Sequence, residues 1–171
     1  ETEPEMAMAI NGIAPGVMAK AVQELGSTLI HISSDYVFDG DHCTPYLESD
    51  PTNPLGIYGQ SKLLGEQRVQ NNCDRHIILR TAWVYGNRGH GNFVKTMLKL
   101  GQERDEIRVV SDQIGSPTWS KDIAATIIQL LTAITLSVDC KDDRDNTALN
   151  LLTRGIYHYT NSGIASWYDF A

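Results

Sequence analysis

The chain has 171 residues, of which 42% are hydrophobic and 20% are charged, and its formal net charge is −7. This length allows one sizeable core, and the acidic balance is evidence against a nucleic-acid or anionic-membrane surface, which would need a basic patch. No apolar run approaches the roughly 20 residues of a membrane span, and three cysteines outside any C-x-x-C pattern indicate reduced thiols in a cytoplasmic protein.

The first part of the chain predicts a helix. Apolar residues recur at helical spacing from Met6 to Ala21, and Gly26 follows as a stop signal. Pro15 lies inside this pattern and should bend the helix near Asn11, whose carbonyl it crowds.

Buried strands and helices then alternate. The apolar runs at 28–33 and 76–80 predict strands, and residues 58–71 between them predict a helix. Further on, the pattern predicts helices at 92–100 and 120–136, a short strand at 107–110, a solvated loop at 141–146 and a last strand at 156–160. Such alternation indicates right-handed crossovers and a parallel sheet, and so an α/β fold. The part after Asn92 is less regular and could form a small lobe.

Tyr58 and Lys62 are the first candidates for chemistry. They lie four residues apart, so a helix would place them on one face. A free Tyr titrates near pH 10, and a nearby ammonium would lower that pKa and make the phenol a usable acid or base. Taken alone, the pair is more typical of an ordinary surface helix.

A group of polar residues, Ser33, Ser34 and Asp35, follows the first predicted strand. The carboxyl end of a parallel strand is where ligands bind in open α/β sheets, and a hydroxyl there can orient a carbonyl. Strand parity favours Ser34 over Ser33. The structural alternative is a helix cap or Asx turn, which is common at a strand exit.

With these residues in place, the chain resembles a known family. "HISSDYVFDG", "PYLESDPTNPLGIYGQSKLLGE", "ILRTAWVYG", "NFVKTML", "VVSDQIGSPT" and "YHYTNSGIASWYDFA" occur in the order typical of dTDP-4-dehydrorhamnose reductases, members of the short-chain dehydrogenase/reductase superfamily. The resemblance implies a partial Rossmann-like parallel sheet with flanking helices and part of a substrate-binding lobe. It implies residues 1–91 for the cofactor-binding half with the catalytic Tyr and Lys, and 92–171 mainly for the substrate lobe.

The implied reaction is hydride transfer from NADPH or NADH to the C4 ketone of dTDP-4-dehydro-L-rhamnose, giving dTDP-L-rhamnose. By position, Ser34 matches the family's catalytic Thr or Ser and would polarise the ketone. Tyr58 would protonate the forming alkoxide, and Lys62 would lower the Tyr pKa and hold the nicotinamide ribose. The resemblance also places Tyr58, Thr81 and Ala82 beside the cofactor.

Four more residues resemble family positions that meet the substrate: Asp35, Trp83, Asn92 and Gln113. Each has a structural alternative. Asp35 could stabilise a turn, Trp83 could be core, Asn92 could cap a helix, and Gln113 could order a loop.

The cofactor's main cradle is absent from the sequence. No strand, glycine-rich turn and helix N-terminus are available for a pyrophosphate, so we expect a fragment that turns over little or nothing alone. No metal site is expected from the histidines, although the full-length family allows Mg²⁺ and a homodimer. Two other classes stay open: a non-catalytic subunit like the regulatory subunit of methionine adenosyltransferase, and a sugar-nucleotide epimerase or dehydratase.

Overall fold

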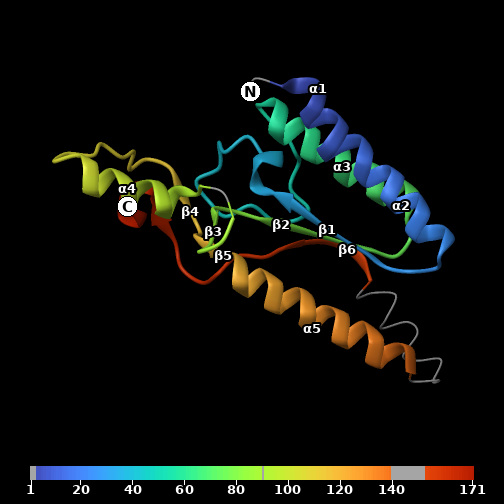
Figure 1. Cartoon of the computed structure of the whole chain (residues 1–171). Helices are drawn as coiled ribbons and strands as arrows, with labels where there is room; N and C mark the ends of the chain where they lie inside the picture. The colour runs from blue at the N-terminus through green and yellow to red at the C-terminus, as the bar shows by residue number, and fades with distance from the viewer. Residues whose placement is uncertain (1–2, 90, 140–152) are drawn as a thin grey trace. The chain divides into compact units, whose positions relative to one another are not determined.

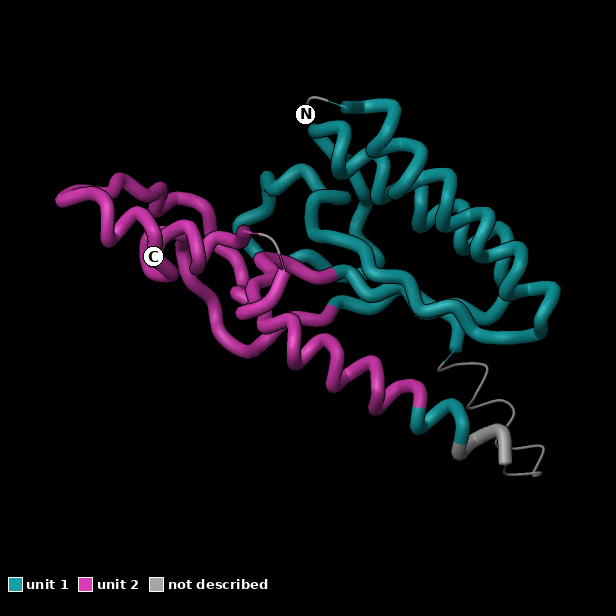
Figure 2. Tube along the Cα trace, in the orientation of Figure 1, with its two compact units in different colours: residues 1–80, 132–158 teal, residues 81–131, 159–171 magenta. Residues whose placement is uncertain are grey.

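The computed structural model describes residues 3–89, 91–139 and 153–171. The chain divides into two compact units (Figure 2). Unit 1 comprises Glu1–Arg80 and Thr132–His158, and unit 2 comprises Thr81–Leu131 and Tyr159–Ala171. The expected division into a cofactor-binding half, residues 1–91, and a substrate lobe, residues 92–171, is one of function, and it stays a prediction.

The sheet of unit 1 has the strand order β1-β2-β6 in the described part of the chain (Figure 1). Its strands are β1 (Leu29–Ser34), β2 (His76–Thr81) and β6 (Arg154–His158). Strands β2 and β6 are parallel, with His76 opposite Arg154 and Arg80 opposite His158. Every residue of β2 is buried, as its apolar run predicts. The predicted α/β fold is confirmed, although β6 begins two residues earlier than expected.

The N-terminal helical segment contains the predicted bend. It runs through α1 (Pro4–Ala7), the π-helical turn η1 (Met8–Ile13) and α2 (Ala14–Glu24). Pro15 has no N–H for the carbonyl of Asn11, and the backbone widens there, so that Ala14 N donates to Ala9 O. Gly26 ends the segment as predicted, with a left-handed φ of 62°.

Helix α3 (Ile57–Asn72) packs against this segment and against β1. Close approach depends on glycines: a Cβ on Gly65 would meet the carbonyl oxygen of Asn11, and one on Gly16 would meet the side chain of Arg68. A hydrogen bond also joins η1 to α3, since Asn11 Nδ2 donates to Ser61 Oγ at 3.2 Å. Below them lies the core of unit 1, formed by Ala19, Val69, Cys73 and Ile78.

Unit 2 is built from short elements around helix α4 (Phe93–Glu103) and the start of helix α5 (Ser120–Asp139). Its strands are β3 (Val84–Tyr85), β4 (Ile114–Gly115), β5 (Thr118–Trp119) and β7 (Ala165–Ser166), followed by α7 (Trp167–Phe170). Strands β3 and β5 pair in parallel, and β4 and β7 pair antiparallel.

The prediction of a strand at 107–110 is wrong. These residues form no strand, and the carbonyl of Val110 accepts a single hydrogen bond from Tyr168 N at 3.0 Å. Strand β7, just before Tyr168, pairs with β4, where Ser166 lies opposite Ile114. The loop predicted at 141–146 lies outside the described residues.

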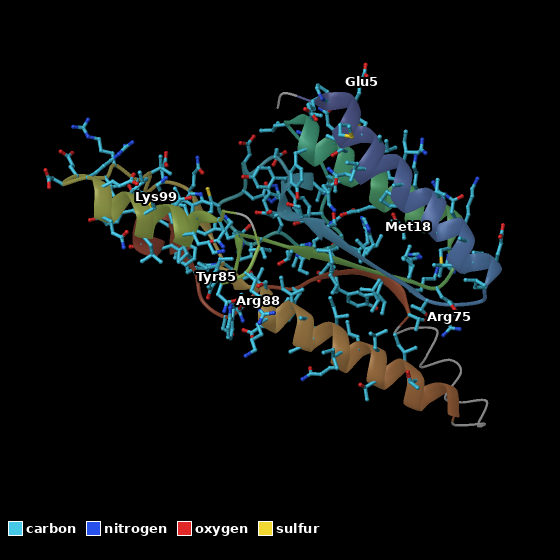
Figure 3. All side chains as sticks on the ribbon, viewed as in Figure 1. Glu5, Met18, Arg75, Tyr85, Arg88 and Lys99 are labelled. Atoms are coloured by element: carbon cyan, nitrogen blue, oxygen red, sulfur yellow. The ribbon has the colours of Figure 1, made fainter. Side chains whose placement is uncertain are left out.

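The outer side of the N-terminal segment is exposed and partly apolar. Glu5 lies in α1 and Met18 in α2, where Met18 is 50% exposed (Figure 3). Among the described residues, no helix has the length and hydropathy needed to cross a membrane.

Candidate active site

Ser34 ends β1 and caps the short 3-10 helix η2 (Asp35–Val37). Its side chain is buried, its Oγ accepts from Tyr36 N at 3.2 Å, and its hydroxyl donates to Asp35 Oδ1 at 3.0 Å. The capping alternative is therefore present in the structure. Capping uses a lone pair of the oxygen, so the hydroxyl proton can turn to another acceptor.

Tyr58 lies in the first turn of α3 and is hydrogen-bonded to Ser34. The next residue explains how the helix start reaches the strand end: a Cβ on Gly59 would lie 2.1 Å from the carbonyl oxygen of Tyr36. The ring of Tyr36 meets that of Tyr58 edge-on, with centroids 5.6 Å apart. The two hydroxyls named from the sequence thus lie together at the carboxyl end of β1.

The pKa of Tyr58 is raised, whereas the sequence predicted that Lys62 would lower it. Burial raises the pKa of Tyr58, the hydrogen bond with Ser34 lowers it, and the Asp35 and Tyr36 charges raise it further. Burial likewise raises the pKa of Asp35, against the lowering effect of the hydrogen bond from Ser34. Tyr58 is therefore held as the neutral phenol, the form that donates a proton.

Lys62 lies one turn beyond Tyr58 on α3 and points to the strand. Its ammonium donates to the carbonyl oxygen of Ile32 in β1 at 2.5 Å. Burial lowers the pKa of Lys62, and the charge of Glu66 raises it. In this arrangement the Lys62 ammonium is bonded to the Ile32 carbonyl, and the pKa of Tyr58 is shifted by burial, the Ser34 hydrogen bond and the charges of Asp35 and Tyr36.

Three residues next to this group were missed from the sequence. His31 in β1 has a buried Nε2 without a hydrogen-bond partner in the described part of the chain. Glu66 and Arg80 form a buried ion pair between α3 and β2. The spacing of Tyr58, Lys62 and Glu66 at successive fourth residues was a visible signal for Glu66, whereas nothing in the sequence marked Arg80 as its partner.

Thr81 and Ala82 come at and just after the carboxyl end of β2. Thr81 is buried, and its Oγ1 has no hydrogen-bond partner among the described residues. An unpaired buried hydroxyl at this end of a strand fits contact with a bound cofactor.

Trp83 and Asn92, in unit 2, are both engaged by neighbours. The ring of Trp83 stacks on Trp167, with centroids 3.6 Å apart, and Gly115 packs directly against the indole. Asn92 caps α4: its Oδ1 accepts from Lys95 N at 3.1 Å and its Nδ2 donates to the Gly86 carbonyl at 2.7 Å.

Gln113 is exposed and directly precedes β4. The contacts of Trp83 and Asn92 fit the core and capping alternatives, and roles of all three residues toward a substrate stay predictions.

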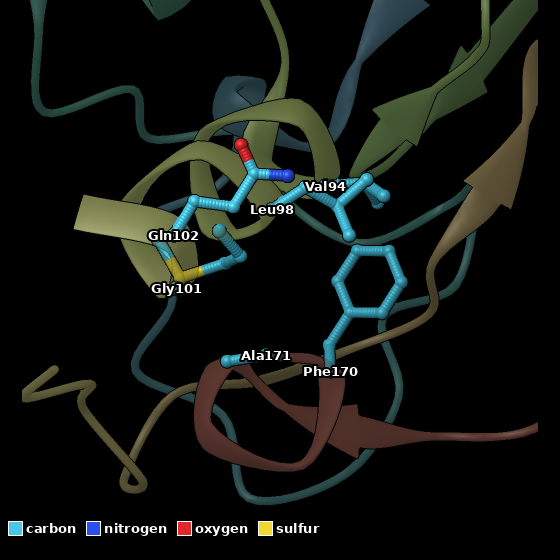
Figure 4. Close-up of a pocket in the computed structure, with 7 residues that line it drawn as sticks. Val94, Leu98, Gly101, Gln102, Phe170 and Ala171 are labelled. Atoms are coloured by element: carbon cyan, nitrogen blue, oxygen red, sulfur yellow. The ribbon is translucent and has the colours of Figure 1, made fainter. Parts of the chain in front are cut away.

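A pocket of about 330 Å³ lies in unit 2 between α4 and the last residues of the chain (Figure 4). Val94, Leu98 and Phe170 contribute apolar side chains to it. None of the site residues named from the sequence lines this pocket. The candidate site therefore rests on the Ser34–Tyr58–Lys62 group rather than on this hollow.

Comparison with known proteins places the sequence in a family. All of it, residues 1–171, matches the family described as the RmlD substrate binding domain. The chain belongs to this family. It is 43% identical over 172 residues to the dTDP-4-dehydrorhamnose reductase of Escherichia coli K12, a match covering 100% of this chain and 52% of that protein.

Two more relatives extend the RmlD family match. The spore coat polysaccharide biosynthesis protein SpsK of Bacillus subtilis is 45% identical over 171 residues, covering 100% of this chain and 53% of that one. A crystal structure of dTDP-4-dehydrorhamnose reductase from Bacillus anthracis in complex with NADP matches with a TM-score of 0.81 at 41% identity, covering 99% of this chain and 54% of that one. The RmlD-family chain thus spans about half the length of the relatives it matches.

Proposed function

We propose that this chain is the catalytic and substrate-binding part of a dTDP-4-dehydrorhamnose reductase. The reaction is reduction of the C4 ketone of dTDP-4-dehydro-L-rhamnose to the alcohol of dTDP-L-rhamnose. The observation that carries the proposal is the hydrogen-bonded Ser34–Tyr58 pair at the end of β1, with Lys62 one turn along α3. Relatives that carry this enzyme's name match the whole chain.

When bound, NADPH or NADH supplies the hydride for the ketone carbon. The residues that would hold the cofactor are Lys62 and Tyr58 together with Thr81 and Ala82. The unpaired buried Oγ1 of Thr81 supports this assignment, as does the NADP in the Bacillus anthracis relative.

The chain's own residues would bind and protonate the oxygen of the ketone. The Ser34 hydroxyl turns from Asp35 and donates to this oxygen, while Tyr58, kept neutral by burial, gives it a proton. The positive charge of Lys62 favours the phenolate that Tyr58 becomes. Asp35 would accept sugar hydroxyls, and the contacts of Trp83, Asn92 and Gln113 with a nucleotide sugar are proposed from the family match.

The test uses the complete protein and dTDP-4-dehydrorhamnose with each reduced cofactor. We expect Tyr58→Phe to lower kcat by roughly 100- to 10,000-fold, because it removes the proton donor and keeps the ring. Tyr168→Phe is the matched control, since it deletes an exposed phenol that does not act on Tyr58 and should leave kcat unchanged. The measurement is the loss of reduced nicotinamide absorbance.

Three results would count against the proposal. Retained activity in Tyr58→Phe would remove Tyr58 from the role of acid. Failure of the unaltered protein to reduce the ketone with either cofactor would point to a non-catalytic subunit. Release of water from a nucleotide sugar would point to a dehydratase.

A further inference from the structure

Ser34 connects a carboxyl group and a phenol at the carboxyl end of β1, wholly within unit 1. Its hydroxyl donates to Asp35 Oδ1 at 3.0 Å, and it is also hydrogen-bonded to Tyr58. One lone pair of its oxygen accepts from Tyr36 N at 3.2 Å. A hydroxyl has one proton and two lone pairs, so the remaining proton and lone pair can serve Asp35 and Tyr58 together. The three side chains form a continuous path along which a proton can move.

The proposed reduction consumes one proton in each turnover. Hydride addition leaves negative charge on the ketone oxygen, and Tyr58 neutralises this charge and becomes a phenolate. Burial raises the pKa of Tyr58, and the charges of Asp35 and Tyr36 raise it further against the lowering effect of the Ser34 hydrogen bond, so the phenolate is a strong base. The phenol has to be restored before a second ketone can be reduced, and this requires a proton donor beside Tyr58.

Asp35 has the properties of such a donor. It is the first residue of η2 and is partly exposed, so it can take up protons from the solvent. Burial raises the pKa of Asp35, and its carboxyl therefore keeps a proton to a higher pH than a free Asp does. An ordinary carboxyl still titrates about six pKa units below a phenol. Transfer of a proton from Asp35 to the Tyr58 phenolate is therefore downhill.

Backbone contacts hold this path in place. The bond from Tyr36 N fixes the Ser34 oxygen, and the start of α3 comes close to η2 because Gly59 has no side chain. Lys62 is directed to the strand, since its ammonium donates to the carbonyl oxygen of Ile32. The hydrogen-bonded path from the carboxyl to the phenol thus runs through Ser34.

We propose that Asp35 returns a proton to the Tyr58 phenolate through the Ser34 hydroxyl after the product has left. The O–H bond of the Asp35 carboxyl breaks as an O–H bond forms on Ser34 Oγ, and the proton that Ser34 already carried moves to the phenolate oxygen. Ser34 is a neutral hydroxyl before and after the transfer. The Asp35 carboxylate then takes a proton from hydronium or a buffer acid. This relay rests on the proposed reductase function and names the source of its proton.

The experiment uses the complete protein with Asp35→Asn or Asp35→Ala. Asn keeps the shape and the oxygen that accepts from Ser34 but carries no acidic proton, whereas Ala leaves room for a small acid. Asp105→Asn is the control, because it removes an exposed carboxylate from unit 2 with the same change in net charge.

Reduced nicotinamide absorbance is followed in two regimes. The first is a single turnover with enzyme in excess over dTDP-4-dehydrorhamnose, and the second is the steady state at saturating substrate. Steady-state assays of Asp35→Ala and of the unaltered protein are repeated with added formate, a small carboxylic acid that can occupy the space left by the Asp35 side chain.

In Asp35→Asn we expect the single turnover to keep its rate, because Tyr58 starts with its proton, while kcat falls roughly 10- to 100-fold. Formate should restore kcat in Asp35→Ala and leave the unaltered protein unchanged, and Asp105→Asn should behave as the unaltered protein does. A purely structural or sugar-binding role of Asp35 would slow both regimes and would not respond to formate. Equal slowing of both regimes without formate rescue overturns the relay, and so does an unchanged kcat.

The unaltered protein separates this relay from the proposed function. If it reduces the ketone and the Asp35 variants show no difference between the first turnover and kcat, only the relay is wrong. If it reduces no ketone with either cofactor, the proposed function fails and the relay fails with it.

Discussion

Both strands that carry the candidate site hold buried polar atoms without a hydrogen-bond partner, as do Thr28, Arg75 and His158 in the described part of the chain. His31 Nε2 and Ser33 Oγ on β1, and Thr81 Oγ1 on β2, are buried without a hydrogen-bond partner among the described residues. Each such atom typically costs about 1–3 kcal/mol, and most proteins keep few of them. At the residue scale, these unpaired atoms lower the stability of the fold, as expected where polar groups are kept for binding.

The effect of His31 on the stability of the fold can be measured. Burial, followed by the charge of Lys62, lowers the pKa of His31 from 6.5 to about 4. Between these values the unfolded chain binds a proton that the folded chain does not, so stability falls as the pH drops through this window. The loss should reach about 3 kcal/mol near pH 4. Urea unfolding at neutral and acidic pH should show a smaller loss in His31→Gln.

His42→Gln is the control for this experiment, because His42 is exposed. If His31→Gln and the unaltered protein lose equal stability on acidification, His31 is not the group responsible.

At the scale of elements, the start of α3 depends on one glycine. A Cβ on Gly59 would lie 2.1 Å from the Tyr36 carbonyl and 2.9 Å from Pro54 Cβ, so backbone has to move. We expect Gly59→Ala to destabilise the fold by about 1–3 kcal/mol and to lower kcat by separating Tyr58 from Ser34. Denaturant unfolding and the reductase assay measure the two effects.

Gly101→Ala in α4 is the matched control, since nothing lies within 4 Å of the added Cβ. Ala is the better helix former by about 1 kcal/mol, so this variant should be stabilised. A stable, active Gly59→Ala would show that the contact with Tyr36 does not set the position of Tyr58.

The elements of unit 1 were largely predictable because their signals are local. The apolar run of β2 and the stop at Gly26 each depend on neighbours in the sequence, and both are confirmed. The bend at Pro15 follows from its missing N–H, although its form as a π-helical turn does not. The proximity of Ser34 and Tyr58 was expected only through the family resemblance.

Long-range partners could not be predicted in the same way. Arg80 looked like the end of a buried strand, and its bond to Glu66 spans 14 residues. The stacking of Trp83 on Trp167 joins residues far apart in the chain, as does the hydrogen bond from Tyr168 N to the Val110 carbonyl. These contacts depend on how elements meet, which periodicity does not encode.

At the scale of the whole molecule, the two units differ in how they are stabilised. The buried hydrophobic cluster of Ala19, Val69, Cys73 and Ile78 lies in unit 1. Unit 2 relies, in its described part, on two-residue strands and on a group of aromatic rings around Trp167. Elements with few buried contacts open more readily than core strands, so the units should differ in local stability.

Hydrogen exchange of the complete protein can test this difference. Ile78 is fully buried, and Ile78→Ala should cost about 2–5 kcal/mol through the lost side chain and the cavity. We expect faster amide exchange in β2 and α3, with little change in β3, β4 and α4. Leu55→Ala is the control, because Leu55 belongs to unit 1 but is 73% exposed. Equal acceleration in both units would mean that they unfold as one cooperative body, and the division into separately stabilised units would then be wrong.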